Sequence, residues 1–202
     1  MKREIESILF NEEKHEYYYK GLRLYGITGA IAKLLGKFFP ENDACMLARI
    51  YGTDVHKEVE NYFNNGNKEL STESGKWVVE NINEFIKINN IKVKDVKSEV
   101  MVSDFEGTAS KIDIVITSLD GTSSYLFDIK TGNFDRPYCS LQLSCYKYLF
   151  ELCYGIKVCG LYVLHTKTKK RFRIIEQNKE RVVKLLEMNK NQVALDLKIT
   201  EV

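Results

Sequence analysis

The sequence predicts an α/β or α+β fold, in which a mixed sheet is flanked by helices. Three changes in the spacing of apolar residues support this prediction. Two helical stretches end near residue 88, three short strand candidates follow one another, and a further helix then leads into one strongly apolar strand. Residues that switch between helical and alternating patterns in this order are typical of a sheet covered by helices.

The N-terminal elements come first in this order. Residues 8–28 are rich in aromatic and β-branched side chains, with turn signals at 11–12 and 20–21. We therefore expect a small β-hairpin or meander there. Thr28 is expected to cap a short helix that ends near Pro40.

Two longer helices are expected next, one from about Asn42 to residue 63 and one over 74–88. Each carries a single apolar stripe at helical spacing. The stripes consist of Val55, Val59, Tyr62 and Phe63 in the first helix and Trp77, Val78, Ile82, Phe85 and Ile86 in the second.

The second half of the chain supplies the sheet. Its strand candidates are short segments with β-branched and aromatic residues. The expected elements are strands over 97–103, 110–119 and 123–130, a helix over 138–154 that stops at Gly155, strands over 157–165 and 171–175, and a helix over 178–189 capped by Asn178.

Length and composition limit the classes of protein to consider. A chain of 202 residues suits one domain, which we divide into an N-terminal extension (1–41), a core (42–177) and a C-terminal helix and tail (178–202). The 30 basic and 28 acidic residues nearly balance, so affinity for a polyanion must come from local clustering. The densest basic run is 167–173, and a solvated hairpin turn explains it equally well.

Several other features are expected to be missing. No apolar run approaches the ~18 residues of a membrane span and no signal-peptide segment opens the chain, so we expect a cytoplasmic protein without membrane contact. The five cysteines form no CxxC pair, which favours buried thiols over a disulfide framework, a zinc ribbon or an iron–sulfur cluster. The P-loop pattern for ATP is also missing.

A predicted hairpin brings two acids together. Asp120-Gly121 is a strong two-residue turn signal between the strands 110–119 and 123–130. With this turn at the centre, Asp113 lies opposite Asp128, and Lys130 projects from the same face.

Two opposed carboxylates repel each other unless a cation lies between them. A divalent ion such as Mg²⁺ resolves this conflict. Lys130 beside it is placed to orient or deprotonate a water or to stabilise negative charge. If the register is off by one residue, the alternative is two ordinary acids on a solvated face.

Four motifs in sequence order resemble the PD-(D/E)XK nuclease superfamily, a restriction-endonuclease-like fold. The likeness is greatest to its RecB-like branch, which holds many phage and CRISPR-associated exonucleases, and it runs from about Gly52 to His165. The motifs are Gly52 to His56, Gly107 to Asp113, Asp128-Ile129-Lys130, and Gln142 to Tyr146.

The resemblance implies a role for each matching residue. Asp113, Asp128 and the main-chain carbonyl of Ile129 would bind the metal, and Lys130 would be the catalytic lysine. His56 matches an additional metal-binding histidine of the branch, and Glu99 stands where some relatives keep a supporting acid.

Other residues would order the site or bind the substrate. Gln142 and Tyr146, on one face of the helix over 138–154, would help to order the site and contact nucleic acid. Arg136 and the basic run with Lys169, Lys170 and Arg171 are candidates for DNA contacts. We expect His15 and His165 to be structural, and the aromatic N-terminal meander to form a lid or a wedge at a DNA end.

The implied function is a Mg²⁺- or Mn²⁺-dependent deoxyribonuclease, without an iron–sulfur cluster and without ATP. Its catalytic core would be 42–177, and its substrate would be DNA ends, single- or double-stranded. Phage or mobile-element recombination, repair or defence is the implied setting, with a recombinase or another nuclease-complex protein as partner and with oligomerisation left open. Two alternatives remain: a catalytically silent DNA-binding or assembly subunit, and a site- or structure-specific endonuclease.

Overall fold

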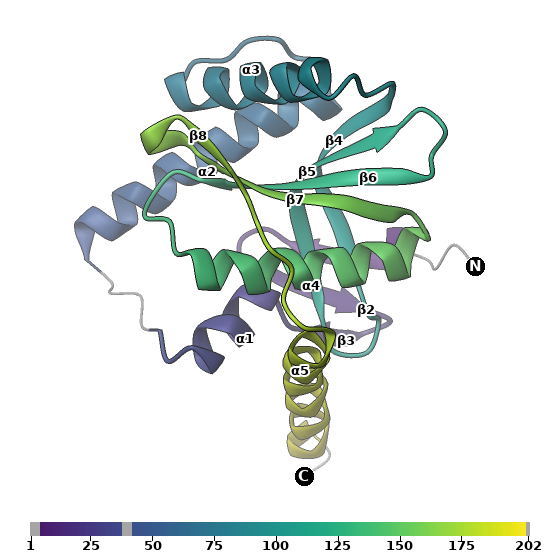
Figure 1. The fold of residues 1–202 in the computed structure, drawn as a ribbon. Coiled ribbons are helices and arrows are strands. Elements are labelled where there is room, and N and C mark those ends of the chain that lie inside the picture. The colour runs from purple at the N-terminus through teal and green to yellow at the C-terminus, as the bar shows by residue number, and fades with distance from the viewer. Residues whose placement is uncertain (1–4, 38–41, 201–202) are drawn as a thin grey trace.

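The computed structural model describes residues 5–37 and 42–200. Its centre is a five-stranded mixed sheet, in which only the β6–β7 pair is parallel, as Figure 1 shows. The predicted fold class is therefore confirmed. The strands, in their order across the sheet, are β4 (Val93–Ser103), β5 (Ala109–Ser118), β6 (Ser123–Lys130), β7 (Lys157–His165) and β8 (Lys170–Arg173).

Helices cover both faces of this sheet (Figure 1). One buried cluster joins the sheet to α2 and α3, and a larger one joins it to α1, α4 and α5. The helices are α1 (Ile27–Leu34), α2 (Asp43–Asn64), α3 (Glu73–Ile88), α4 (Arg136–Tyr154) and α5 (Lys179–Thr200), with short 3₁₀ turns η1 (Ile5–Ser7) and η2 (Thr166–Thr168).

Polar side chains begin most of these helices, and of these caps the sequence predicts the one at Asn178. The side chains of Asn42, Thr72 and Asp135 each accept a backbone N–H of the first turn of α2, α3 and α4. Asn178 accepts the N–H of Glu180 in the same way at α5. Gly155 ends α4 in the left-handed conformation, with a φ of 67°, which glycine adopts without steric cost.

The prediction for α1 is wrong in its details. The helix begins at Ile27, after Gly26, without a side-chain cap, so Thr28 lies inside the first turn instead of capping it. The helix ends at Leu34, and the predicted end near Pro40 lies outside the described residues. Thr28 accepts no capping N–H because the chain enters the helix directly from the bridge at Tyr25, two residues earlier than expected.

The N-terminal meander is confirmed. It consists of β1 (Ile8–Asn11), β2 (Glu16–Tyr19) and β3 (Leu22–Leu24). Tyr25 joins it to the central sheet: its N–H donates to the carbonyl of Gly107 at 2.8 Å, and its carbonyl accepts the N–H of Ala109 at 3.2 Å. This small sheet therefore packs on the end of β4 and β5 rather than extending away from them.

The β5–β6 register is the predicted one. Paired residues run from Thr117–Ser124 to Ile114–Phe127. The loop is longer than predicted, since β5 ends at Ser118 and β6 begins at Ser123. Only Gly121 in it has a positive φ, and its N–H donates to the carbonyl of Ser118. The register is unaffected because the loop keeps the same centre.

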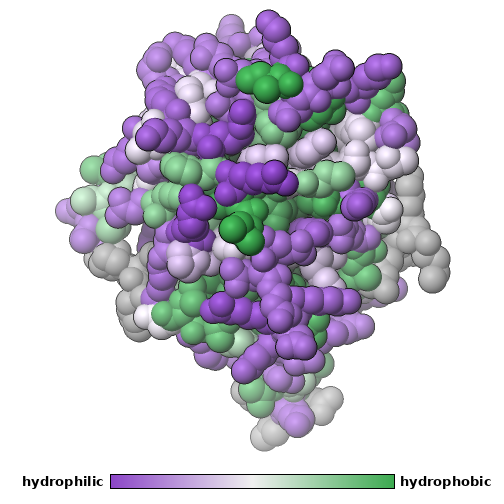
Figure 2. Space-filling model, viewed as in Figure 1, coloured by the Kyte–Doolittle hydropathy of each residue, from purple (hydrophilic) through white to green (hydrophobic). Residues whose placement is uncertain are grey.

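The surface in Figure 2 is largely hydrophilic, with apolar patches between charged side chains. Among the described residues, no helix combines the length and the apolar character that crossing a bilayer requires.

Candidate active site

The site lies where β5 and β6 separate. Their last backbone pair is Ile114–Phe127, whereas β6 continues along β7 as far as Lys130. At the fork, Oδ2 of Asp113 accepts the backbone N–H of Ile129 at 2.6 Å. The Asp113 carboxylate thus accepts a backbone N–H that a carbonyl of the neighbouring strand would accept in a continuous ladder. At the predicted Asp113–Asp128 pair, β5 and β6 are therefore separated and leave an opening between them.

Three side chains from three elements meet at this opening. Nδ1 of His56, on α2, lies 3.5 Å from Oε1 of Glu99 and 3.6 Å from Oδ1 of Asp113. One ligand atom from each residue lies within 4.8 Å of the other two. The structure therefore brings His56 and Glu99, which are 43 positions apart in the sequence, to the aspartate that the hairpin supplies.

Glu99 reaches this position through an unusual backbone conformation. It lies in the middle of β4 with a φ of 53°, which costs a non-glycine residue on the order of 1–3 kcal/mol. The side chain of Asn64, at the end of α2, makes two hydrogen bonds of 2.9 Å to the backbone of the preceding Ser98. Ser98 in turn donates its hydroxyl to the carbonyl of Asp113 at 2.5 Å. These bonds hold the strained strand against both α2 and β5.

A second set of side chains holds Lys130. Its Nζ lies 3.0 Å from Oδ1 and 2.8 Å from Oδ2 of Asp128, and it donates to Oε1 of Gln142 at 3.2 Å. Gln142 Nε2 donates to the hydroxyl of Tyr146 at 2.9 Å, which confirms that the two residues share a face of α4. Both side chains are 3% exposed, so they lie behind the site and support Lys130.

Burial and neighbouring charges shift the pKa values of these groups. Burial lowers the pKa of His56, but Asp113, Glu99 and Asp128 together raise it to about 9. Burial raises the pKa of Asp113 to about 7, with His56 opposing the shift and Asp128 and Glu99 adding to it. Burial also lowers the pKa of Lys130, but Asp128 more than compensates, so the net shift is upward and the amine is charged at neutral pH.

The donor atoms at the fork fit a divalent cation. Two carboxylates and an imidazole converge within 4.8 Å. Oδ2 of Asp128, which is 1% exposed, accepts no hydrogen bond of good geometry from any described residue, although Lys130 lies close by. Mg²⁺ and Mn²⁺ prefer carboxylate, carbonyl and water oxygens, which the two acids supply, whereas imidazole is a commoner ligand of Zn²⁺, Fe²⁺, Ni²⁺ and Cu²⁺. A bound cation would favour the ionised form of Asp113 and so oppose both the burial and the repulsion from Asp128 and Glu99 that raise its pKa.

The group opens into a cleft of about 760 Å³. His56 and Glu99 lie in its wall. The remaining walls come from α2, from the β1–β2 hairpin and from the turn after β6, including Arg49, Lys57 and Gly132. His165 supports that turn, since its Nε2 lies 2.8 Å from the carbonyl of Gly132, in agreement with its predicted structural role.

The predicted DNA-contacting residues lie around the same end of the sheet. Lys169 donates to the carbonyl of Glu73, and Arg171 donates to the backbone and side chain of Asn81, so both also tie β8 to α3. Lys170 and Arg136 are exposed. The guanidinium of Arg136 lies over Phe134 and Phe172, 5.8 and 5.7 Å from the ring centroids.

Sequence reasoning missed two features of the site. Asn64 shows no local signal, because its role depends on where α2 meets β4. His15, expected to be structural, lines the cleft and is exposed. Its position after the Asn11 turn, next to three consecutive tyrosines, was the one available signal.

Comparison with known proteins gives little further information. No family model and no curated protein matches the sequence. Among solved structures, a protein from Eubacterium rectale named as a candidate exonuclease has a TM-score of 0.41 and 15% identity, over 89% of this chain and 82% of its own. A protein named SSO0001 has a TM-score of 0.32 and 18% identity, over 80% and 81% of the two chains. Both TM-scores are below 0.5, so neither likeness indicates a function for this chain.

Proposed function

We propose that the protein is a metal-dependent nuclease that hydrolyses phosphodiester bonds in DNA. The observation that carries this proposal is the fork between β5 and β6. There, His56, Glu99 and Asp113 converge within 4.8 Å, and the Asp128–Lys130 pair lies directly beside them. The four sequence motifs that resemble PD-(D/E)XK nucleases supply the same residues, with Glu99 as the supporting acid.

His56, Glu99, Asp113 and Asp128 would hold the metal, together with the carbonyl of Ile129. A bound divalent ion supplies Lewis-acid stabilisation of charge on the phosphate and activation of water. The protein's own contribution is to fix the ligands before substrate arrives. Asp113 is fixed by the N–H of Ile129, and Glu99 by the bonds between Asn64 and Ser98.

Lys130 would act as a charged group rather than as a base. Because the carboxylate of Asp128 raises its pKa above the ordinary value, the amine keeps its proton at neutral pH. A preorganised cation offsets the negative charge that grows on the phosphate in the transition state. Gln142 and Tyr146 keep the amine in position.

Cleavage from DNA ends is the mode that we propose. The cleft is bounded by α2 on one side and by the β1–β2 hairpin on the other, a shape that suits the end of a strand. The setting in phage or mobile-element DNA metabolism follows from the sequence resemblance alone and is part of the same proposal.

The test is a digestion assay on end-labelled linear DNA, single- and double-stranded, and on closed circular DNA, with Mg²⁺, Mn²⁺ or EDTA. We expect metal-dependent loss of terminal nucleotides from linear DNA. Cleavage of the circle would indicate an endonuclease instead. If the protein binds DNA but cleaves it with neither metal, the remaining hypothesis is a catalytically silent DNA-binding subunit.

Variants connect the activity to the site. Lys130→Ala should abolish cleavage, whereas Lys94→Ala, which removes an exposed lysine from β4, should not. Because loss of Lys130 leaves Asp128 buried without its counter-ion, thermal melting must show that the variant is folded. Asp113→Asn gives an independent loss of activity that keeps the side-chain shape.

A further inference from the structure

His15 stands at the rim of the cleft as an exposed aromatic side chain. It lies at the end of the turn between β1 and β2. Its ring meets the rings of Phe10 and Tyr17 in edge-to-face geometry, with interplanar angles of 86° and 76° and centroid distances of 5.2 and 6.0 Å. These two contacts hold the imidazole in one orientation beside the cleft.

The backbone of His15 is strained. Its φ is 52°, a left-handed conformation that costs a residue other than glycine about 1–2 kcal/mol. Asn11 Oδ1 accepts the N–H of Lys14, which stabilises the turn just before it. Strained residues that a fold retains are frequently found at ligand sites. Other described residues share this conformation, Glu99 of the metal group among them, so the strain supports a role for His15 only together with its place at the cleft.

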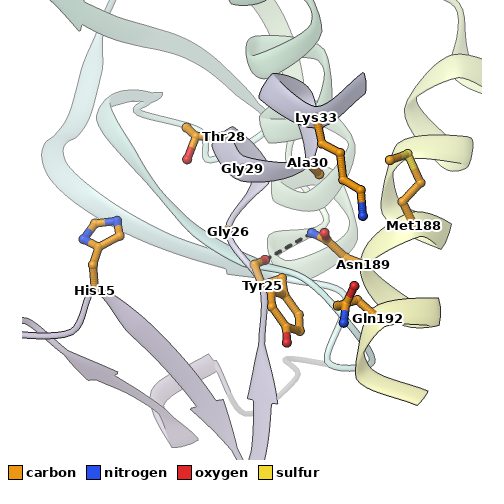
Figure 3. Close-up of a pocket in the computed structure, with 10 residues that line it drawn as sticks. All are labelled: His15, Tyr25, Gly26, Thr28, Gly29, Ala30, Lys33, Met188, Asn189 and Gln192. Carbon is orange, nitrogen blue, oxygen red and sulfur yellow. Dashed lines mark hydrogen bonds between the residues drawn. The ribbon is translucent and has the colours of Figure 1, made fainter. Parts of the chain in front are cut away.

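His15 also borders a second pocket, of about 420 Å³, between α1 and α5. Figure 3 shows His15 on one side of this pocket, with Lys33 of α1 and Met188 and Gln192 of α5 on the other. No described residue in its lining is acidic, and Lys33 adds a positive charge. The pocket and the metal cleft are both lined by His15.

Cations line the opposite wall of the cleft. Arg49 and Lys57, both exposed, lie eight residues apart on α2, which separates them by about 12 Å along the helix. Grooves that bind single-stranded nucleic acid combine such cations, which contact phosphates, with aromatic rings on which bases stack. The cleft offers both kinds of group, with Arg49 and Lys57 on α2 and the ring of His15 in the β1–β2 turn, alongside the acids Glu12 and Glu60.

We propose that His15 is a base-stacking platform for an unpaired nucleic-acid strand. The strand runs from the metal group along the cleft, crosses His15 and enters the pocket between α1 and α5. Stacking on a side chain requires a base that is free of its duplex neighbours, so the substrate in the cleft is single-stranded or a frayed end. The identity of the ligand rests on the proposed nuclease function.

Binding of a fluorescent single-stranded oligonucleotide in EDTA tests this proposal without turnover. His15→Asn removes the ring while keeping a residue that tolerates the left-handed conformation. We expect this variant to bind at least about 10-fold more weakly, within the range measured for one stacked base. His15→Phe should restore binding. Tyr18→Thr removes an aromatic ring from the neighbouring strand, outside the cleft lining, and should leave binding unchanged.

A scan with one abasic nucleotide separates stacking from a general loss of affinity. At one position the abasic nucleotide should weaken binding to the wild type by a similar factor and have no further effect on His15→Asn. Equal affinity of His15→Asn and wild type, or additive losses at every position, would overturn the proposal. The binding assay involves no cleavage, so the two proposals can fail separately. If the abasic effect depends on His15 but the protein cleaves no DNA, only the proposed nuclease function is refuted. If the protein cleaves DNA but the abasic effect does not depend on His15, only the stacking platform is refuted.

Discussion

Charge and burial oppose each other at the residues of the fork. Asp113 and Asp128 are 8% and 1% exposed, and a buried carboxylate is costly unless it is paired. Lys130 pairs with Asp128, and His56 lies beside Asp113. This balance is incomplete, since the pKa of Asp113 remains raised to about 7. Burial is the main cause of this shift and repulsion from Asp128 and Glu99 adds to it, and a bound cation would oppose both.

The stability of the metal-free protein should fall as the pH rises from about 6 to 9. The pKa of Asp113 is raised from 3.8 to about 7, so the unfolded chain releases this proton at lower pH than the folded chain, and the stability falls until the pH reaches about 7. The pKa of His56 is raised from 6.5 to about 9, so the stability it contributes below 6.5 is lost as pH rises through 9. Thermal melting in EDTA over this range measures the fall.

Metal should reverse this trend, because ligation requires both groups to be deprotonated. The increase in melting temperature caused by Mg²⁺ or Mn²⁺ should therefore grow with pH. A metal-free protein whose stability is flat or increases from pH 6 to 9 would contradict the assigned shifts.

Glu99→Gln removes one negative charge while preserving length and backbone. If Glu99 is a ligand, the affinity for Mn²⁺ should fall by at least about 10-fold, a loss typical even of residues that only support ligands. Glu60→Gln, which changes an acid of the same cleft outside the three-residue group, is the control. Equal losses in both variants would point to general charge rather than to coordination.

At the scale of elements, the site depends on how α2 meets β4. The Nδ2 of Asn64 donates to the carbonyl of Ser98, and its Oδ1 accepts the N–H of Ser98. These two bonds pair the backbone of β4 where its edge would otherwise be open. This contact fixes the strand just before the left-handed Glu99. The local register of the hairpin was predictable, because the Asp120-Gly121 turn determines it within a short segment. The conformation of Glu99 was not, because it depends on a residue 35 positions earlier in the sequence.

Asn64→Ala should lower the free energy of unfolding by about 1–3 kcal/mol, since it leaves a buried strand edge without partners. It should also weaken metal binding, because Glu99 loses its support. Asn65→Ala is the matched control, since the side chain of Asn65 donates to Asn61 Oδ1 on the exposed helix end rather than to β4. Urea unfolding and Mn²⁺ titration measure the two effects, and a variant that loses neither would show that Glu99 is positioned by other contacts.

At the scale of the whole molecule, the N-terminal segment completes the site. It was predicted as an extension, and the sequence indicated its meander but not its packing. Tyr17 of β2 is 3% exposed, and burial together with the nearby Glu99 and Asp113 raises its pKa. Long-range packing of this kind has no signature in the spacing of apolar residues, so the sequence suggested a lid or wedge but not that His15 and the β1–β2 hairpin line the cleft.

Gly107 links the meander, the β4–β5 turn and α5. A Cβ there would lie 2.5 Å from the backbone N and 2.7 Å from the Cα of Lys190, so α5 would have to move. Gly107→Ala should therefore destabilise the fold by about 1–3 kcal/mol, the usual cost of overpacking. Gly29→Ala, in open space within α1, should be neutral or stabilising. Equal stabilities of the two variants in urea would mean that α5 is not closely docked.

The most direct test of the metal centre is a titration of the protein with Mn²⁺, with free Mn²⁺ followed by its paramagnetic resonance signal. Wild-type protein at pH 8 should bind the ion, and Asp113→Asn should lose this binding while remaining folded, since asparagine keeps the acceptor for the N–H of Ile129. Absence of binding by the wild type, or equal binding by the variant, would contradict a metal centre at the fork and with it the proposed nuclease.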